Sequence, residues 1–447
     1  MRILIVGAGD VGVHLSKLLA RENINTTLMD EDANRLGNLS NNYDIMTQIG
    51  SPLSIHDLRN AGADEADLFI AVTPYESDNI TSCILAHNLG ARRTLARVDN
   101  YEYILPENKP FFQKVGIDHI IYPEVLAAKE ISESLRNSWI RNRLSLCDGA
   151  LELVVVKVRS NAEMVGKKFC TGYFNHGHYR VVAIKRHSHT IIPGGNDEIM
   201  PGDLICVVMT EGNMELLRQQ AGKVSYEIHE VTVMGATKIA QKTIQNIQHG
   251  KLSIKLMDPD VERIERVAGK LDEKNLLLLK IDMRNTDAVR DEGIDRTDAF
   301  IAVSDSSEAN ILACLAAKRN GVRKTIAEVE NNDYIRLAES LDIGAVVNKK
   351  MIAASYIYQL TLDASVLNVR NLTSCDAEVV EFAVPEGAKI TKGLIRDLKL
   401  PVDVNIGGLV RDGVGQTVNG NTQICAGDKV IVFCPADAIR KLEKFFR

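Results

Sequence analysis

The sequence lacks the features of several protein classes. Its apolar runs, such as LICVVM at 204–209 and LLLL at 276–279, fall far short of the ~20 residues that a membrane-spanning helix needs. Acidic residues slightly outnumber basic ones, and the net charge of −6 does not indicate a basic protein that binds nucleic acid. The N-terminus leads directly into a strand pattern and a glycine turn, so we expect no signal peptide.

Cysteine pairs at metal-binding or redox spacing are also missing. The eight cysteines are scattered without a C-x-x-C motif. A chain of 447 residues, 45% hydrophobic and 25% charged, has the composition of a globular protein and can bury several cores without disulfides. We therefore expect reduced thiols in a cytoplasmic protein.

What the sequence does contain is an internal repeat. Matching segments and residues recur in the two halves: LMD at 28–30 and 256–258, FIAVT at 69–73 and FIAVS at 300–304, ARVDNYEYI at 96–104 and AEVENNDYI at 327–335, Asn79 and Asn310, Cys83 and Cys314. Self-similarity of this kind indicates a duplicated architecture.

Each half alternates short apolar strands with helical patterns and then changes character. In the first half we expect strands at 2–6, 26–30, 44–49, 68–73, 93–98 and 119–122. Such alternation predicts an α/β fold with a doubly wound, Rossmann-like parallel sheet. The second part of each half is richer in period-two runs and turn residues, which predicts a small α+β module that is mostly β.

The repeat and the change of pattern together predict four domains. They are a first nucleotide-binding domain with its linking helix at 1–140, a small C-terminal module at 141–225, a second, degenerate Rossmann-like domain at 226–370 and a second small module at 371–447.

The linking stretch of the first half, 123–142, has an amphipathic pattern. It sets Ile131, Leu135 and Trp139 four residues apart on one helical face, which needs something to pack against. If the two halves pack on each other as two subunits would, exchange of the linking helices supplies that partner.

The glycines of GAGDVG mark the candidate site. In a G-x-G-x-x-G turn the first glycine permits the tight turn, the second lets a pyrophosphate approach the backbone, and the third lets the helix pack close to the strand. Gly7, Gly9 and Gly12 stand at these positions. Asp30 ends the next strand and is placed for a ribose 2′-hydroxyl, which favours NAD or an adenosine nucleotide over NADP. The alternative is a structural glycine turn with a capping aspartate.

The second copy of this motif is altered. Gly235 and Asp258 keep the first glycine and the acid, but Thr237 and Ala240 replace the second and third glycines. A Cβ at the second position crowds a pyrophosphate. We favour a structural role for this half over binding of a ligand in a different pose.

With these motifs the chain resembles the TrkA family, the regulatory subunits of Trk-type potassium uptake systems. The likeness covers almost the whole chain and rests on GAGDVG, LMDED, DLFIAVT, ARVDN and IIYPE, and on PGD at 201–203 and GD at 427–428 in the small modules. Each half resembles a regulator-of-conductance-of-potassium (RCK) unit.

The resemblance implies a function. NAD(H), ATP or ADP would bind in the first crevice as a regulatory ligand, and the paired folds would form a homo-oligomeric gating ring, a dimer or a tetramer. That ring would control a membrane-embedded, TrkH-like potassium channel subunit from the cytoplasm, peripheral on the inner face of the cell membrane. The resemblance implies neither enzymatic activity nor a nucleic-acid partner.

The resemblance also assigns residues. Gly50 and Ser51 would border the adenine, Arg97 would counter phosphate charge, and Glu124 matches a position that in some relatives reaches the neighbouring subunit's nucleotide, sometimes through a divalent cation. In the second half Glu328 stands where Arg97 does, and Lys349 aligns with Pro123. The full set implied to bind the nucleotide is Gly7, Ala8, Gly9, Asp10, Val11, Gly12, Asp30, Gly50, Ser51, Thr73, Arg97, Glu124 and, in the second half, Asp258.

Other interpretations of these residues stay open at this point. Arg97 fits a surface salt bridge, and Glu124 fits a helix N-terminus, where a carboxylate offsets the helix dipole. Two histidine pairs, His176 with His178 and His187 with His189, allow a metal site, but no carboxylate or cysteine cluster accompanies them, so we expect no metal.

Two other functions use the same nucleotide fold. A soluble NAD-dependent oxidoreductase needs a catalytic partner domain, and each nucleotide fold here is followed only by a small β module. A redox-sensing DNA-binding repressor needs a helix-turn-helix or a basic patch, and we find neither in the sequence. We therefore predict no catalytic residues.

Overall fold

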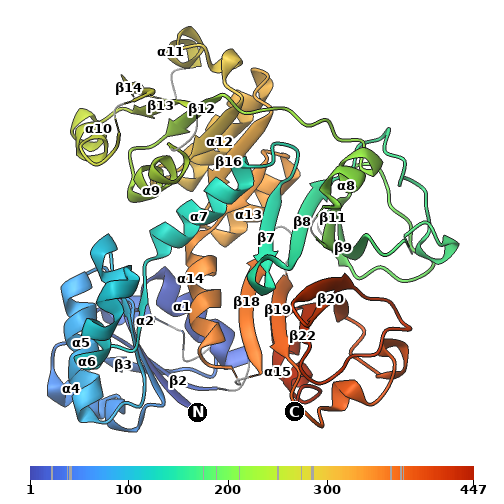
Figure 1. Ribbon diagram of the computed structural model, residues 1–447. Helices are drawn as coiled ribbons and strands as arrows, with labels where there is room; N and C mark the ends of the chain where they lie inside the picture. Colours follow the sequence, from blue (N-terminus) through green and yellow to red (C-terminus); the bar gives the residue numbers. More distant parts are fainter. Residues whose placement is uncertain are drawn as a thin grey trace. The chain divides into compact units, whose positions relative to one another are not determined.

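The computed structural model describes the chain from Met1 to Arg447 except residues 22–23, 38, 40–42, 175, 188, 211, 249–250, 273, 283–285, 363–364, 373–374 and 376. Four sheets follow one another along the sequence, alternately parallel and antiparallel (Figure 1). The predicted fold class, two Rossmann-like sheets each followed by a small and mostly β module, is confirmed.

The first sheet is parallel and doubly wound. Its strands are β1 (Arg2–Val6), β2 (Asn25–Asp30), β3 (Met46–Ile49), β4 (Leu68–Ala71), β5 (Thr94–Arg97) and β6 (His119–Ile121). Its helices are α1 (Asp10–Arg21), α2 (Ala33–Leu36), α4 (Ile55–Asn60), α5 (Glu76–Leu89) and α6 (Lys109–Lys114). The spatial order β3-β2-β1-β4-β5-β6 reverses direction between β1 and β4, and ligands of such sheets bind beside the carboxyl ends of the strands at this switch point.

The second parallel sheet repeats this topology. Its strands are β12 (Glu230–Met234), β13 (Ser253–Asp258), β14 (Leu276–Lys280), β15 (Ala299–Ala302), β16 (Lys324–Glu328) and β17 (Ala345–Val347). Its helices are α9 (Lys238–Ile247), α10 (Val261–Ala268), α11 (Thr286–Asp291), α12 (Ser307–Arg319) and α13 (Asn332–Ser340). The order is again reversed between the first strand and the fourth, and every residue of β4 and of β15 is buried. Such continuous apolar strands are expected where both faces of a sheet are covered.

Each small module is an antiparallel sheet followed by a short helix. The first contains β7 (Asn142–Leu146), β8 (Leu151–Lys157), β9 (Tyr179–Arg186), β10 (His189–Ile191), β11 (Leu204–Thr210) and α8 (Met214–Gln220). The second contains β18 (Val366–Leu372), β19 (Ala377–Ala383), β20 (Asn405–Arg411), β21 (Val414–Thr417), β22 (Lys429–Cys434) and α15 (Ile439–Glu443).

The aspartate of the recurring Gly-Asp element holds each small module together. Asp203 is buried, and its two carboxylate oxygens accept hydrogen bonds from Arg186 Nε at 2.9 Å and Nη2 at 2.8 Å. Asp428 makes the same bidentate pair with Arg411, at 2.8 and 2.7 Å. The motif is therefore an internal ion pair that ties the turn before the last strand to an earlier strand of the same sheet.

The linking helices are exchanged between the halves. Close contacts divide the chain into one unit made of residues 1–126 with 349–362 and another made of 127–348 with 363–447. Helix α14 (Lys349–Gln359), encoded by the second half, thus belongs to the first nucleotide-binding domain, where it lies along α1 (Figure 1). Most of α7 (Pro123–Leu135), encoded by the first half, belongs to the other unit.

The predicted apolar face of the linking helix is only partly correct. Ile131 and Leu135 are buried on α7, but the helix ends at Leu135. Trp139 lies beyond that end and packs in the core of the first small module, together with Val154 and Tyr179. The amphipathic pattern thus continues past the helix because the following segment enters a second core.

The expectation of reduced thiols throughout is wrong for one pair. Cys206 of β11 and Cys375, beside β19, form a disulfide between the two small modules, with their Cα atoms 7.7 Å apart. That Cα separation exceeds the usual range of about 4.4–6.8 Å. The other six cysteines form no disulfide.

Removing Asp203 should destabilise the first small module. Because Asp203→Ala leaves Arg186 half-buried without its partner, we expect a loss of about 3 kcal/mol in the free energy of unfolding, measured by denaturant titration. Asp305→Ala removes the partner of Arg263 in an exposed pair and should cost less than about 1 kcal/mol. Equal losses in the two variants would contradict the role given to Asp203.

Stability should rise with pH above neutrality because of Lys324. This lysine of β16 is buried and donates to the carbonyl of Ile140, and burial, with Arg141 and Lys223 nearby, lowers its pKa to about 7. Between about 7 and the ordinary value of 10.5, the unfolded chain holds a proton that the folded chain has released, so raising the pH favours the folded state.

Replacing Lys324 by methionine tests whether this lysine causes the pH dependence. The free energy of unfolding of the Lys324→Met variant should increase less with pH between neutrality and pH 10 than that of the wild type. Burial also lowers the pKa of Lys318 and of Lys223 to about 8, so part of the pH dependence should persist in the variant. Parallel curves for the variant and the wild type would contradict this assignment.

Candidate nucleotide-binding site

The candidate site lies where the first sheet reverses, at the carboxyl ends of β1, β2 and β4. The chain leaves β1 after Val6 and turns through Gly7, Ala8 and Gly9 into α1, whose first residue is Asp10. The backbone amides at the start of such a helix are suited to bind an anion, because they have no partner within the helix.

The three glycines of the turn are required for different reasons. Gly7 has φ +105°, and a Cβ there would lie 2.9 Å from the backbone nitrogen of Thr73. A Cβ at Gly12 would collide with the carbonyl oxygen of Gly7. Beyond its two chain neighbours, a Cβ at Gly9 would have no atom of the described residues within 4 Å. The fold itself therefore explains Gly7 and Gly12, whereas Gly9 borders open space, as a pyrophosphate site requires.

Asp30 is part of the structure of the turn. It is buried at the end of β2, and its Oδ2 accepts a hydrogen bond from the amide of Ala8 at 2.6 Å while Oδ1 accepts one from the amide of Asp32 at 2.9 Å. The structural aspartate considered from the sequence is thus observed. A carboxylate has about four acceptor positions, so these two bonds leave room for ribose hydroxyls.

Gly50 and Ser51 follow β3 at the same edge of the sheet. The amide of Ser51 donates to Asp57 Oδ2 at 3.0 Å, and a Cβ at Gly50 would lie 2.9 Å from the Cβ of Asp57. These contacts fix the turn between β3 and α4. Close packing against Asp57 is therefore enough to require glycine at position 50, whether or not a ligand binds.

Asn79 is a positioning residue that the site assignment from sequence missed. Its buried side-chain amide donates to the carbonyl of Thr73 at 3.0 Å and to that of Arg97 at 2.9 Å, and its oxygen accepts from the amide of Thr73 at 2.8 Å. It therefore holds the ends of β4 and β5 together, and β4 ends at Ala71 rather than at Thr73. The match of Asn79 with Asn310 was the sequence signal, since Asn310 makes the same bonds to Ser304 and Glu328.

Arg97 and Glu124 pair with each other. Arg97 Nη2 lies 3.3 Å from Glu124 Oε1, and Glu124 stands in the first turn of α7. Glu124 Oε2 is buried and makes no hydrogen bond with the residues that the structure describes. The salt bridge and the helix N-terminus, both considered as alternatives from the sequence, are thus both present.

Lys350 is the second residue that the sequence missed. It comes from α14, and its ammonium contacts Asp10 Oδ2 at the first residue of α1. The Lys350 side chain is 18% exposed, and that of Asp10 is 73% exposed. In the aligned repeat Lys350 occupies the place of Glu124, but only the exchange of α14 brings it to the first site.

The second half has no open space at the position that corresponds to Gly9. Thr237 stands where Gly9 does, and its hydroxyl donates to the carbonyl of Val303 at 2.9 Å and accepts from the amide of Ala240 at 3.3 Å, which caps α9. Asp258 still accepts from the amide of Ala236, at 2.7 Å. The acid is thus kept for the turn, while the position of the second glycine is filled.

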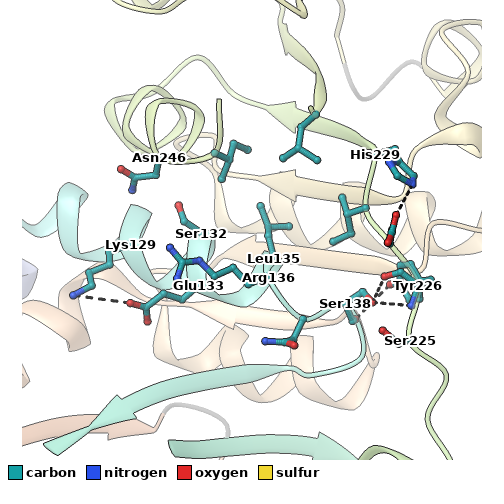
Figure 2. Close-up of a pocket in the computed structure, with 15 residues that line it drawn as sticks. Lys129, Ser132, Glu133, Leu135, Arg136, Ser138, Ser225, Tyr226, His229 and Asn246 are labelled. Carbon is teal, nitrogen blue, oxygen red and sulfur yellow. Dashed lines mark hydrogen bonds and ion pairs between the residues drawn. The ribbon is translucent and has the colours of Figure 1, made fainter. Parts of the chain in front are cut away.

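Two cavities lie away from these residues. One, of about 700 Å³, is lined by α7, by residues 225–229 and by α9. Figure 2 shows Lys129 paired with Glu133, and the hydroxyl of Ser138 donating to the carbonyl of Tyr226. The other, of about 630 Å³, lies at the amino ends of β1 to β3, the edge of the sheet opposite to the glycine turn. Neither contains a residue of the predicted site.

The histidines of the first pair lie close together. The rings of His176 and His178 are 5.2 Å apart, and Nδ1 of His176 accepts from the backbone amide of His178 at 3.1 Å. Burial lowers the pKa of His176. Within the described ranges, no three or more His, Cys, Asp or Glu residues are grouped to hold a metal ion.

The described residues also include no helix that is both long and apolar enough to cross a bilayer. The apolar residues are instead distributed over the cores of the four sheets.

In each half of the chain, both the nucleotide-binding domain and the small module match domains of known proteins. Residues 3–123 and 231–349 match the TrkA-N domain, and residues 153–222 and 379–447 match the TrkA-C domain. The chain is 28% identical over 449 residues to the Trk system potassium uptake protein TrkA homolog of Archaeoglobus fulgidus, with 100% of both chains covered. It is 27% identical over 455 residues to the Trk system potassium uptake protein TrkA of Halomonas elongata, covering 100% of this chain and 99% of the relative.

Solved structures share the fold. The crystal structure of the GsuK RCK domain superposes with a TM-score of 0.62 at 14% identity, over 100% of this chain and 94% of that one. The GsuK channel bound to NAD gives a TM-score of 0.60 at 15% identity, over 100% and 78% of the two chains. Since the matched domains cover most of the sequence in the same repeated order, the chain belongs to the TrkA family of Trk potassium uptake proteins.

Proposed function

We propose that this chain is a nucleotide-sensing regulatory subunit of a Trk-type potassium uptake system. NAD(H), ATP or ADP binds in the first crevice and shifts the conformation of a gating ring that controls a membrane-embedded channel subunit. The observation that carries the proposal is the open space at Gly9, where no described residue beyond its two neighbours packs against an added Cβ. The names of the relatives and the NAD-bound GsuK channel support the same assignment.

Each residue of the first site has a role in this proposal. The amides from Gly7 to Gly12 receive the pyrophosphate, and Asp30 accepts from the ribose hydroxyls. Gly50 and Ser51 border the adenine, Thr73 lies beside the nucleotide, and Arg97 counters the phosphate charge. The second nucleotide-binding domain, which has Thr237 where the first has Gly9, acts as a scaffold. The proposal also keeps the division of the chain into four domains, with boundaries after residues 140, 225 and 370.

The role is regulatory rather than enzymatic. An oxidoreductase needs a proton donor or acceptor within reach of the nicotinamide. Among the described residues of the crevice, Arg97 and Glu124 already form a pair with each other, and Asp30 is engaged by two backbone amides. We therefore assign no catalytic residue.

An exposed apolar edge supports assembly into a ring. Four large apolar side chains at and after β3 are between 48% and 59% exposed: Met46, Ile49, Leu53 and Ile55. Their exposure within one short segment supports a protein interface that would cover them. In the proposal the homo-oligomer covers this edge and lies peripherally on the cytoplasmic face of the membrane.

Nucleotide controls such a ring only if it distinguishes two conformations. A ligand shifts an equilibrium by its difference in affinity for the two states, and about 1–3 kcal/mol of coupling is typical. The turn at Gly7 to Gly9 is tied to β2 through Asp30 and lies against the end of β4, so phosphates bound there act on three elements together.

Replacing Gly9 by valine tests the nucleotide site with little risk to the fold. Because a Cβ there has no described atom within 4 Å beyond its two chain neighbours, we expect the melting temperature to change by less than about 2 °C. The dissociation constants of NAD⁺ and ADP, measured by calorimetry, should rise at least about tenfold because the side chain occupies the pyrophosphate position.

Two variants serve as controls. Gly12→Val should impair folding, since its side chain would collide with the Gly7 carbonyl. Thr237→Val, at the matching position of the second half, removes a helix cap but should leave nucleotide affinity unchanged. Wild-type affinity in Gly9→Val would show that the first crevice is not the binding site.

A further inference from the structure

The exchanged helix α14 brings a positive charge from the second half to the glycine turn of the first. Lys350 contacts the carboxylate of Asp10, which is the first residue of α1. The lysine side chain is largely covered, whereas the aspartate is mostly exposed. The ammonium is therefore held in place beside the helix N-terminus, and its carboxylate partner is free to turn toward solvent.

A phosphate group and Asp10 attract the same charges. The N-terminus of α1 carries a partial positive charge, which favours Asp10 in the absence of ligand and favours phosphate when nucleotide binds. Both anions also attract the ammonium of Lys350, and they repel each other at short range. Binding of a phosphate at the glycine turn thus weakens the hold of Asp10 on Lys350.

We propose that Lys350 is a phosphate ligand of the first nucleotide site, supplied by the second half of the chain, and that Asp10 is its counter-ion when no nucleotide is bound. This inference rests on the proposed function, because it assumes nucleotide in the first crevice. On binding, the ammonium passes from the carboxylate of Asp10 to the phosphate oxygens.

The proposal makes the site independent of a divalent cation. An ammonium supplies the positive charge that a bound metal ion would otherwise provide between phosphates and protein carboxylates. The described residues group no set of metal-ligating side chains at this position. Nucleotide should therefore bind with equal affinity in excess chelator and in excess Mg²⁺.

The proposal also couples the two halves. Lys350 stands in the first turn of α14, and the chain continues from α14 into the second small module. Phosphate charge at the first site therefore acts directly on a helix of the second half. Nucleotides with more phosphate charge should act more strongly, in the order ATP, ADP, AMP.

The test compares Lys350→Met, Lys350→Arg and Asp10→Asn in the full chain, with nucleotide affinities measured by calorimetry. Lys350→Met should raise the dissociation constant of ATP about tenfold and that of AMP much less, because a hydrogen-bonded charge pair is lost. Lys350→Arg, which keeps the charge, should retain affinity within about threefold. Asp10→Asn should tighten ATP binding, since a competing anion is removed.

Two further variants complete the test: one reverses the charge of Lys350, and the other removes the charge of the neighbouring Lys349. Lys350→Glu should bind ATP weakly in chelator and recover affinity in Mg²⁺, because a cation can then bridge two anions. Lys349→Met changes the net charge equally on the same helix and should leave the affinity within about twofold of the wild type.

The outcomes separate this inference from the proposed function. If Lys350→Met binds ATP, ADP and AMP as the wild type does, whereas Gly9→Val loses them, Lys350 is not a ligand and the nucleotide site stands. Equal losses for all three nucleotides in Lys350→Met would indicate a structural effect and overturn the inference. Failure of the wild-type chain to bind any nucleotide would overturn the proposed function itself.

Discussion

The backbone of the turn from β1 into α1 lies directly against the end of β4, and this close approach governs the site. It leaves room only for hydrogen at Gly7, and the carbonyl of Gly7 in turn leaves room only for hydrogen at Gly12. Asp30 holds the turn from the other side through the amide of Ala8. The same approach recurs in the second half, where a Cβ at Gly235 would lie 2.6 Å from the nitrogen of Ser304.

This constraint explains why the second half keeps part of the motif and loses the rest. Gly235 and Asp258 are needed for the turn whether or not a ligand binds, so both persist. Of the three motif glycines in the first half, only Gly9 has a position where an added Cβ meets no described neighbour, and there the second half places Thr237, whose hydroxyl caps α9. The exchange of α14 makes the second half indispensable all the same, because the first nucleotide-binding domain includes a helix that the second half encodes. A duplicated chain can thus lose one ligand site while both folds are retained.

The sequence predicted the sheets because their signals are local. Alternating apolar runs, the glycine turn and the repeat were enough for the fold class, and the strands of the first sheet end within about two residues of their predicted ends. Contacts between distant segments were harder to foresee. The position of Lys350 beside Asp10 depends on the exchange of α14, and the role of Asn79 depends on two strand ends meeting in space. Trp139 followed the helical spacing of its neighbours but packs in another core. The disulfide between Cys206 and Cys375 joins modules whose contact no spacing in the sequence reveals.

The central claim is that one half of the duplicated chain senses nucleotide and the other supports it. The most direct test is the stoichiometry of ADP and NAD⁺ binding to the full chain, measured by calorimetry at protein concentrations well above the dissociation constant. The account predicts one site per chain for each nucleotide, with the two competing for it. Two sites per chain, or simultaneous binding of both nucleotides, would show that the domain containing Thr237 still holds a ligand and would contradict the account.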